Sequence, residues 1–273
     1  MVKDRTFADV LGHSFWEEAD GSVWFATGDY NLRGIGLVRF KDGKFNKFGL
    51  EKGLSNDRIF FRFKDREGTV WLATDRGLNR LRQQVLTPLS TKDGLIHNEV
   101  YPILKSRDGS IYIGTTSGLS HYKDGKFTNT ILRLGKDKVV SSLQSLWEDA
   151  EGRLWIGLVE GLYVMKDGKF ENKTQIFDQP QTIFAIHSQI DGTIWFATER
   201  HGIYQYRDEK IIAHYTTAEG LPSNDVKVIH EAKDGTLWFG TYGGISHFKD
   251  GKFTNYTTNE GLASNFVRSI KED

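Results

Sequence analysis

The stretch DGTLWFGTYGGISHFKDGKF, residues 234–253, contains a tryptophan, two Asp-Gly pairs and a Gly-Gly pair within twenty residues. Taken alone, its glycines are compatible with a phosphate-binding loop, and Tyr242 is compatible with a ligand-binding loop. The stretch is not unique, however: related copies occupy residues 20–45, 67–86, 108–127, 151–170 and 191–211. Its meaning therefore depends on the repeat and not on any single copy.

The period of the repeat is that of a propeller blade. The glycine of the first turn recurs at spacings of 47, 41, 43, 40 and 43 residues, at Gly21, Gly68, Gly109, Gly152, Gly192 and Gly235. Each copy contains four short segments that alternate apolar and polar or small residues, as strands do. Asp250-Gly251 joins the last two segments of its copy, because both residues tolerate the positive φ angles of a type I′ turn. Four antiparallel strands in each repeat predict a β-propeller blade.

We predict an all-β fold: a single β-propeller domain over residues 1–273, built from four-stranded antiparallel blades. Six blades are expected, with seven as the alternative, and residues 266–273 are expected to be a surplus first strand. The predicted repeats are residues 12–57, 58–99, 100–141, 142–181, 182–225 and 226–265. One large aromatic residue of each second strand is expected to be buried between neighbouring sheets, namely Trp24, Trp71, Tyr112, Trp155, Trp195 and Trp238.

Composition narrows the classes of function. Lys plus Arg and Asp plus Glu both number 36, so the positive surplus that nucleic acid requires is missing, and no nucleic-acid partner is expected. The chain has no cysteine, which excludes disulfides and thiolate metal sites. It has no apolar run of membrane-spanning length and no signal-peptide pattern in residues 1–10, so no membrane insertion is expected. A complete, stand-alone chain of this kind would be cytoplasmic.

The pattern GLPSNDVKVIHEAKDGTLWFGTYGGISHF, residues 220–248, closely resembles the two-component-regulator propeller repeat, and residues 53–81 and 261–273 share the pattern. Such repeats typically form the extracytoplasmic sensor portion of bacterial hybrid histidine kinases and related signalling proteins. The resemblance implies a periplasmic or extracellular, non-enzymatic sensor. In such a sensor, ligand binding would bias the orientation of the propeller against its neighbours.

A weaker resemblance links DGSVWFAT (20–27) and DGTIWFAT (191–198) to propellers of the streptogramin-lyase type. Members of that group hold a metal at the centre of the ring with histidines and an acid, and those residues do not map onto this chain. The Asp-Gly pairs lie in separate blades, and the histidines lack local metal-ligand spacing. We therefore expect no metal and no cofactor. A lyase or hydrolase with a site in the channel remains the alternative function, and a protein-docking scaffold is a third.

The two ends of the predicted blades differ in sequence. The turns from strand one to two and from strand three to four are uniform, whereas the loops from strand two to three vary and emerge at the opposite end. Binding residues concentrate on variable loops held by a rigid frame. The sequence therefore predicts a site for a small polar ligand such as a glycan, or for a protein partner, near the central opening of the variable end. The candidate residues are Tyr30, Arg33, Arg76, Glu160, Arg200, His201 and Tyr242. The competing interpretation is an ordinary solvated rim of charged loops.

Overall fold

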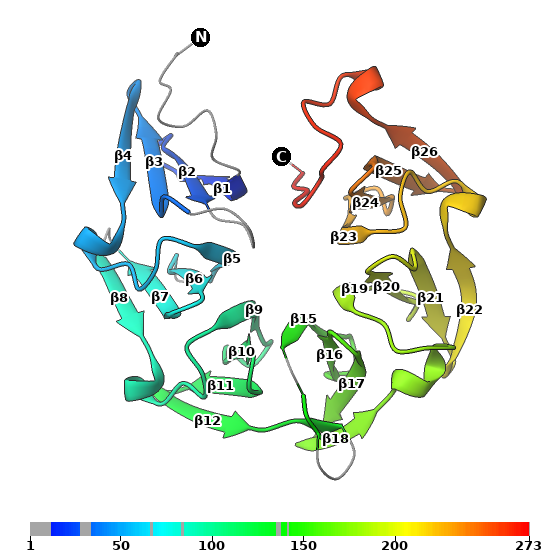
Figure 1. The fold of residues 1–273 in the computed structure, drawn as a ribbon, viewed down its shortest axis with the longest axis horizontal. Coiled ribbons are helices and arrows are strands. Elements are labelled where there is room, and N and C mark those ends of the chain that lie inside the picture. The colour runs from blue at the N-terminus through cyan, green and yellow to red at the C-terminus, as the bar shows by residue number, and fades with distance from the viewer. Residues whose placement is uncertain are drawn as a thin grey trace. The chain divides into compact units, whose positions relative to one another are not determined.

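The structure is a computed structural model that describes residues 12–27, 34–65, 68–82, 85–134, 138–140 and 142–272. These residues form six four-stranded antiparallel sheets, and within each sheet the strands follow one another in chain order. This is the topology of propeller blades, so the predicted fold class and the six blades are confirmed (Figure 1). The chain divides into two compact units, Met1–Val140 and Ser141–Asp273, called unit 1 and unit 2 below.

Unit 1 contains the first three blades. They are β1 (Gly12–Glu17), β2 (Val23–Thr27), β3 (Leu37–Lys41) and β4 (Lys44–Phe48); β5 (Ile59–Lys64), β6 (Val70–Thr74), β7 (Gly77–Arg82) and β8 (Val85–Leu89); and β9 (Val100–Lys105), β10 (Ile111–Thr115), β11 (Leu119–Lys123) and β12 (Lys126–Thr130). A short hairpin that the repeat did not predict, β13 (Arg133–Leu134) with β14 (Lys138–Val139), follows the third blade.

Unit 2 contains the last three blades. They are β15 (Leu143–Glu148), β16 (Leu154–Leu158), β17 (Gly161–Lys166) and β18 (Lys169–Asn172); β19 (Ile183–Ser188), β20 (Ile194–Thr198), β21 (Ile203–Arg207) and β22 (Lys210–Tyr215); and β23 (Val226–Glu231), β24 (Leu237–Thr241), β25 (Gly244–Lys249) and β26 (Lys252–Tyr256). Figure 1 shows the first strands β15, β19 and β23 on the inner side of this unit, with β18, β22 and β26 on its outer side.

The predicted hairpin turns are present, with positive φ angles at both central residues. In the last blade, for example, Asp250 has φ 51° and Gly251 has φ 76°. The fifth blade makes the same turn without glycine, since Asp208 has φ 49° and Glu209 has φ 61°. A left-handed glutamate is strained, but Lys173 and the hydroxyl of Tyr206 donate hydrogen bonds to its carboxylate at 2.7 and 2.9 Å. These contacts offset the strain of the glycine-free turn.

The linkers between blades contain short 3-10 helices that the sequence analysis did not predict. They are η1 (Leu50–Lys52), η2 (Thr91–Asp93), η3 (Thr174–Ile176), η4 (Thr217–Glu219) and η5 (Thr258–Glu260). In η5 the Thr257 side chain and the Glu260 carboxylate form a reciprocal capping box, and Gly261 ends the helix with φ 104°. The same Ser/Thr-x-x-Asp/Glu pattern precedes a glycine at η2 and η4, so it was readable from the sequence.

The core of each unit lies between successive sheets. Trp155 is fully buried against Phe196 and Tyr206 of the following blade, with ring centres 5.7 and 5.6 Å away. Trp195 is buried in the same way against the next blade. Burying such a ring is worth about 2–3 kcal/mol. Trp24 and Trp71 are also buried, which confirms the prediction for four of the six positions. Tyr112 and Trp238, in the last blade of each unit, are only partly buried.

Residues 266–272 lie against the last blade but do not form the predicted surplus strand. The Val267 N–H donates to the Thr241 carbonyl at 2.9 Å, and no ladder follows in the described residues. A Cβ atom at Gly240 would lie 2.8 Å from Cγ1 of Val267, just as one at Gly157 would lie 2.8 Å from Cβ of Ile183. Val267 therefore packs where a following first strand packs, although the strand pairing itself is missing.

A buried threonine fixes the variable loop in five of the blades. Its hydroxyl donates to the carbonyl of the glycine that ends the loop, in the pairs Thr27–Gly36, Thr74–Gly77, Thr115–Gly118, Thr198–Gly202 and Thr241–Gly244. In the last blade this bond is 2.8 Å long, and the same hydroxyl accepts from the Gly243 N–H at 3.0 Å. Both bonds lie at the end of β24, so they set the position of Tyr242.

Thr241→Val keeps the shape of the side chain and removes these two hydrogen bonds. Because the loop's polar groups then lose their buried partner, we expect the free energy of unfolding to fall by about 1–3 kcal/mol in denaturant titrations. The matched control is Thr254→Val on the exposed side of β26, which should change stability by less than about 0.5 kcal/mol. Equal effects of the two substitutions would contradict the role given to the threonine.

Candidate functional site

The predicted site residues lie in different places. Tyr30 and Arg33 lie outside the described residues, so the structure does not place them. Arg76 is exposed in unit 1, in the loop between β6 and β7. The other four lie in unit 2, in the loops β16–β17, β20–β21 and β24–β25; they are Glu160, Arg200, His201 and Tyr242.

The loop between β20 and β21 is fixed by His201. Its Nδ1–H donates to the Glu199 carbonyl at 2.9 Å, and its Nε2 accepts from the side-chain amide of Gln179 at 2.7 Å. Arg200, just before it, is exposed and has φ 64°, in the left-handed region. The imidazole thus holds a tight loop in shape, and the structure gives Arg200 and Glu160 solvent-exposed positions at the same end of their blades.

Tyr242 lies in a cluster of rings and cations, called the Tyr242 cluster below. It consists of Phe184 from β19, Lys227 from β23, Tyr242, and Phe266 and Arg268 from the segment after η5. The Phe266 ring packs edge-on against Tyr242 with centres 5.1 Å apart. The Lys227 Nζ lies 4.7 Å from the centre of the Tyr242 ring, and the guanidinium carbon of Arg268 lies 6.0 Å from it. Two cations therefore flank one aromatic ring.

Lys227 is the most unusual charge of the cluster. Its Nζ lies 3.2 Å from the centre of the Phe184 ring, which removes water from one side of the ammonium group. Burial lowers the pKa of Lys227 to about 8, although the carboxylates of Glu199 and Asp225 act to raise it. The charge of Arg268 lowers it further. No carboxylate oxygen of a described residue lies within ion-pairing distance of this ammonium group.

The sequence analysis named Tyr242 as a candidate and did not name the other residues of the cluster. Phe184 and Lys227 are the second residues of their first strands, and Arg268 follows Val267 in the same way. The equivalent residues in unit 1 include Phe60 and Tyr101, whose rings stack with centres 5.2 Å apart. The residue type at this second position differs between blades, whereas the residue before it is apolar in most blades. An alignment of the six repeats would have identified this variable position as a candidate for binding.

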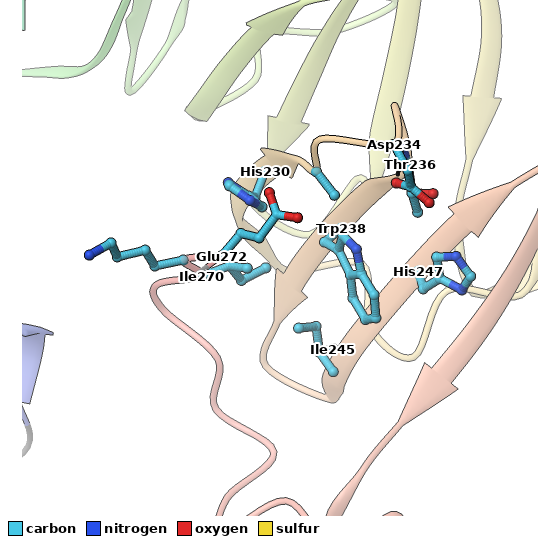
Figure 2. A pocket seen from close by; sticks show the side chains of 10 residues that line it. His230, Asp234, Thr236, Trp238, Ile245, His247, Ile270 and Glu272 are labelled. Atoms are coloured by element: carbon cyan, nitrogen blue, oxygen red, sulfur yellow. Dashed lines mark hydrogen bonds between the residues drawn. The ribbon is translucent and has the colours of Figure 1, made fainter.

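The cavity in Figure 2, of about 460 Å³, lies at the last blade, and its lining includes no residue of the Tyr242 cluster. Trp238, Ile245 and His247 form one wall, and Ile270 and Glu272 approach from the chain end. Trp155 and Trp195, at the equivalent positions of the two preceding blades, are buried by the sheet that follows each of them. The cavity is therefore lined by a blade face of the kind that elsewhere in unit 2 packs against a sheet, and we do not assign it a ligand.

Two further observations concern the described residues. They contain no group of three or more histidine, aspartate or glutamate side chains placed to hold a metal ion. None of the helices in the described part of the chain is long and apolar enough to cross a membrane. The Tyr242 cluster offers instead two cations, an exposed ring and hydrogen-bonding loops, which suit non-covalent recognition.

The lowered pKa of Lys227 can be measured directly. Reductive ¹³C-methylation followed by NMR titration should show one lysine resonance with a midpoint near pH 8, since burial favours the neutral amine. Lys227→Met should remove the resonance that titrates early. The matched control is Lys252→Met, at an exposed lysine at the start of β26, which should leave that early resonance in place. If that resonance is absent from the wild-type protein, the ammonium group is solvated and the cluster is looser than described.

The chain is similar to a known repeat family in part of its sequence and to known proteins in structure. Residues 220–243 match the family model described as the two component regulator propeller. No curated protein sequence matches the chain. Among solved structures, the extracellular domain of the one component system BT4673 from B. thetaiotaomicron is similar with a TM-score of 0.62 and 20% identity. That match covers 91% of this chain but 39% of the other, so the chain spans about two fifths of that domain.

Other similar structures have different functions. Virginiamycin B lyase from Staphylococcus aureus, solved with quinupristin, has a TM-score of 0.72 and 15% identity over 96% of this chain and 88% of its own. The WD40 β-propeller domain of Doa1 has a TM-score of 0.62 and 12% identity, covering 91% and 86%. Identities this low establish the fold and leave the activity open. The predicted resemblance is confirmed at the level of the repeat: residues 220–243 match the two component regulator propeller, and the described residues form β-propeller blades.

Proposed function

We propose that the chain is a non-enzymatic recognition module that binds a small polar ligand such as a glycan at the Tyr242 cluster. The observation that carries this proposal is the placement of an exposed ring beside two cations at the variable-loop end of unit 2. Phe266 is 62% exposed although it packs against Tyr242. Its exposed face offers a surface on which a flat ligand ring can stack, beside the two cations that flank Tyr242.

The chemistry of the cluster suits a saccharide. Aromatic faces take up the apolar faces of a sugar ring, while nearby polar groups accept or donate the hydrogen bonds that orient it. The Thr241 hydroxyl holds the loop that carries Tyr242 through its bonds to Gly243 and Gly244, and the Tyr242 N–H donates to the Asp225 carbonyl at 3.1 Å. The ring is therefore preorganised, so that binding requires little ordering of the loop.

The proposal includes a sensor role outside the cytoplasm. Its support is the family of the matched repeat and the similarity to extracellular domains of sensor proteins from B. thetaiotaomicron. In such a sensor the ligand would shift the equilibrium between two arrangements of the protein by no more than its difference in affinity for them. Recognition rather than turnover is proposed because the described residues offer rings and cations at this site; the likeness to a lyase rests on fold at 15% identity.

Tyr242→Ala should weaken binding of a stabilising saccharide by about tenfold or more. The substitution removes the ring against which Phe266 packs and beside which Lys227 and Arg268 lie. Tyr242→Phe keeps the ring and should bind within about threefold of the wild type. The ligand is first found by thermal-shift screening of an oligosaccharide library, and the dissociation constants are then measured by calorimetry.

Tyr256→Ala is the matched control, since this tyrosine is also partly exposed but lies on β26 of the same blade. It should leave the dissociation constant unchanged. A screen in which no saccharide raises the melting temperature at millimolar concentration would contradict the proposal and favour a protein-docking scaffold. A melting temperature that falls on addition of a chelator would favour a metal-dependent enzyme instead.

A further inference from the structure

The charge state of the Tyr242 cluster identifies the class of saccharide more closely. Lys227 projects from β23 between the rings of Phe184 and Tyr242, at 3.2 and 4.7 Å from their centres. Its ammonium group is held by ring faces and has no ion-pair partner among the described residues. A second cation, Arg268, approaches the same tyrosine from the segment after η5.

A half-buried ammonium group that lacks a counter-ion is costly, because it has lost part of its hydration without gaining a full charge partner. Ring faces replace only part of that hydration. The nearest acidic groups, Glu199 and Asp225, act on Lys227 from a distance and are engaged elsewhere in part: the Glu199 carboxylate accepts from the Thr182 hydroxyl at 3.1 Å. An anionic group placed at Lys227 would therefore restore a missing interaction.

A ligand bound at the exposed Phe266 ring would bring an anionic group toward Lys227 and Arg268. Phe266 and Tyr242 have ring centres 5.1 Å apart, and Lys227 and Arg268 flank that same tyrosine. A sugar ring stacked on Phe266 would present its substituents to both cations. Neutral sugars would leave the ammonium group without a counter-ion, whereas acidic sugars would supply one.

We propose that the ligand is an acidic saccharide whose anionic group, a carboxylate or a sulfate ester, is bound by Lys227 and Arg268. This inference rests on the proposed function and specifies its ligand. Lys227 is the primary contact, because it is the half-buried cation that lacks an ion-pair partner, and Arg268 adds a second positive charge beside the same ring.

The test uses calorimetry with the full chain and three probes of matched length. The first is oligogalacturonate, which carries carboxylates, and the second is its methyl ester, which is neutral. The third is a galactan oligosaccharide whose only charged groups are sulfate esters. We expect at least one acidic probe to bind about tenfold or more tightly than the methyl ester. The probe that binds more tightly identifies the source of the anionic group.

Three variants connect this preference to the lysine. Lys227→Met should abolish the preference for the acidic probe and should leave the melting temperature equal or raised, since a poorly solvated charge is removed. Lys227→Arg keeps the charge and should retain the preference. Lys252→Met, at the Asp-Gly turn end of β26, should change neither property.

The pH dependence gives an independent readout. Lys227 loses its charge as the pH rises through about 8, so binding of the acidic probe to the wild-type protein should weaken above that pH. The other charged groups that act on Lys227 are Glu199, Asp225 and Arg268. Lys227→Arg should therefore bind the acidic probe with little change between about pH 7 and pH 9.5.

The outcomes separate the two proposals. Equal binding of acidic and neutral probes, with no effect of Lys227→Met, would overturn the acidic-ligand inference and leave saccharide recognition intact. Tight binding of an acidic probe that survives Lys227→Met would overturn the assignment of the lysine. If acidic and neutral saccharides both fail to bind, the proposed function and this inference fail together.

Discussion

The burial of one large aromatic ring between successive sheets is the interaction on which the rest of each unit depends. Trp155 and Trp195 are almost inaccessible to solvent because the following blade supplies rings that pack against them. A blade cannot bury both of its faces alone, so each sheet is stabilised by its neighbours. Within each unit the first strands are thereby brought side by side, and a residue next to the buried one can contact its equivalent in the adjacent blade, as Phe60 contacts Tyr101 and Phe184 contacts Lys227.

The second position of the first strand varies between blades, because the packing of the blades does not fix its residue type. The neighbouring residues of the strand pack against the sheets. In contrast, Phe184 of one blade contacts Lys227 of the next blade. The variable loop adds Tyr242, and buried threonine hydroxyls fix the loop. A scaffold of similar blades thus produces a local combination of rings and cations at β19, β23 and the loop of Tyr242, and the proposed recognition function uses that combination rather than the shared motif.

Much of the fold followed from the sequence because strand alternation, turn chemistry and period all indicated the same blade. Asp250-Gly251 adopts the predicted turn, and β23 to β26 lie within a residue or two of the predicted segments. Tyr242 was named as a candidate because loop variability is visible in one sequence, and its role stays a prediction. Lys227, Phe184 and Arg268 were missed because their meeting depends on the lateral packing of blades, which local patterns do not encode. The prediction of a surplus strand at residues 266–273 was incomplete for the same reason: similarity to a first strand does not supply a pairing partner.

The central claim is that ligand recognition takes place at the Tyr242 cluster, and a crystal structure with an acidic oligosaccharide bound tests it most directly. The account predicts a sugar ring against Phe266, with its anionic group within hydrogen-bonding distance of the Lys227 Nζ. A saccharide bound at the Asp-Gly turns, or in the cavity beside Trp238, with the Tyr242 cluster unoccupied, would contradict it.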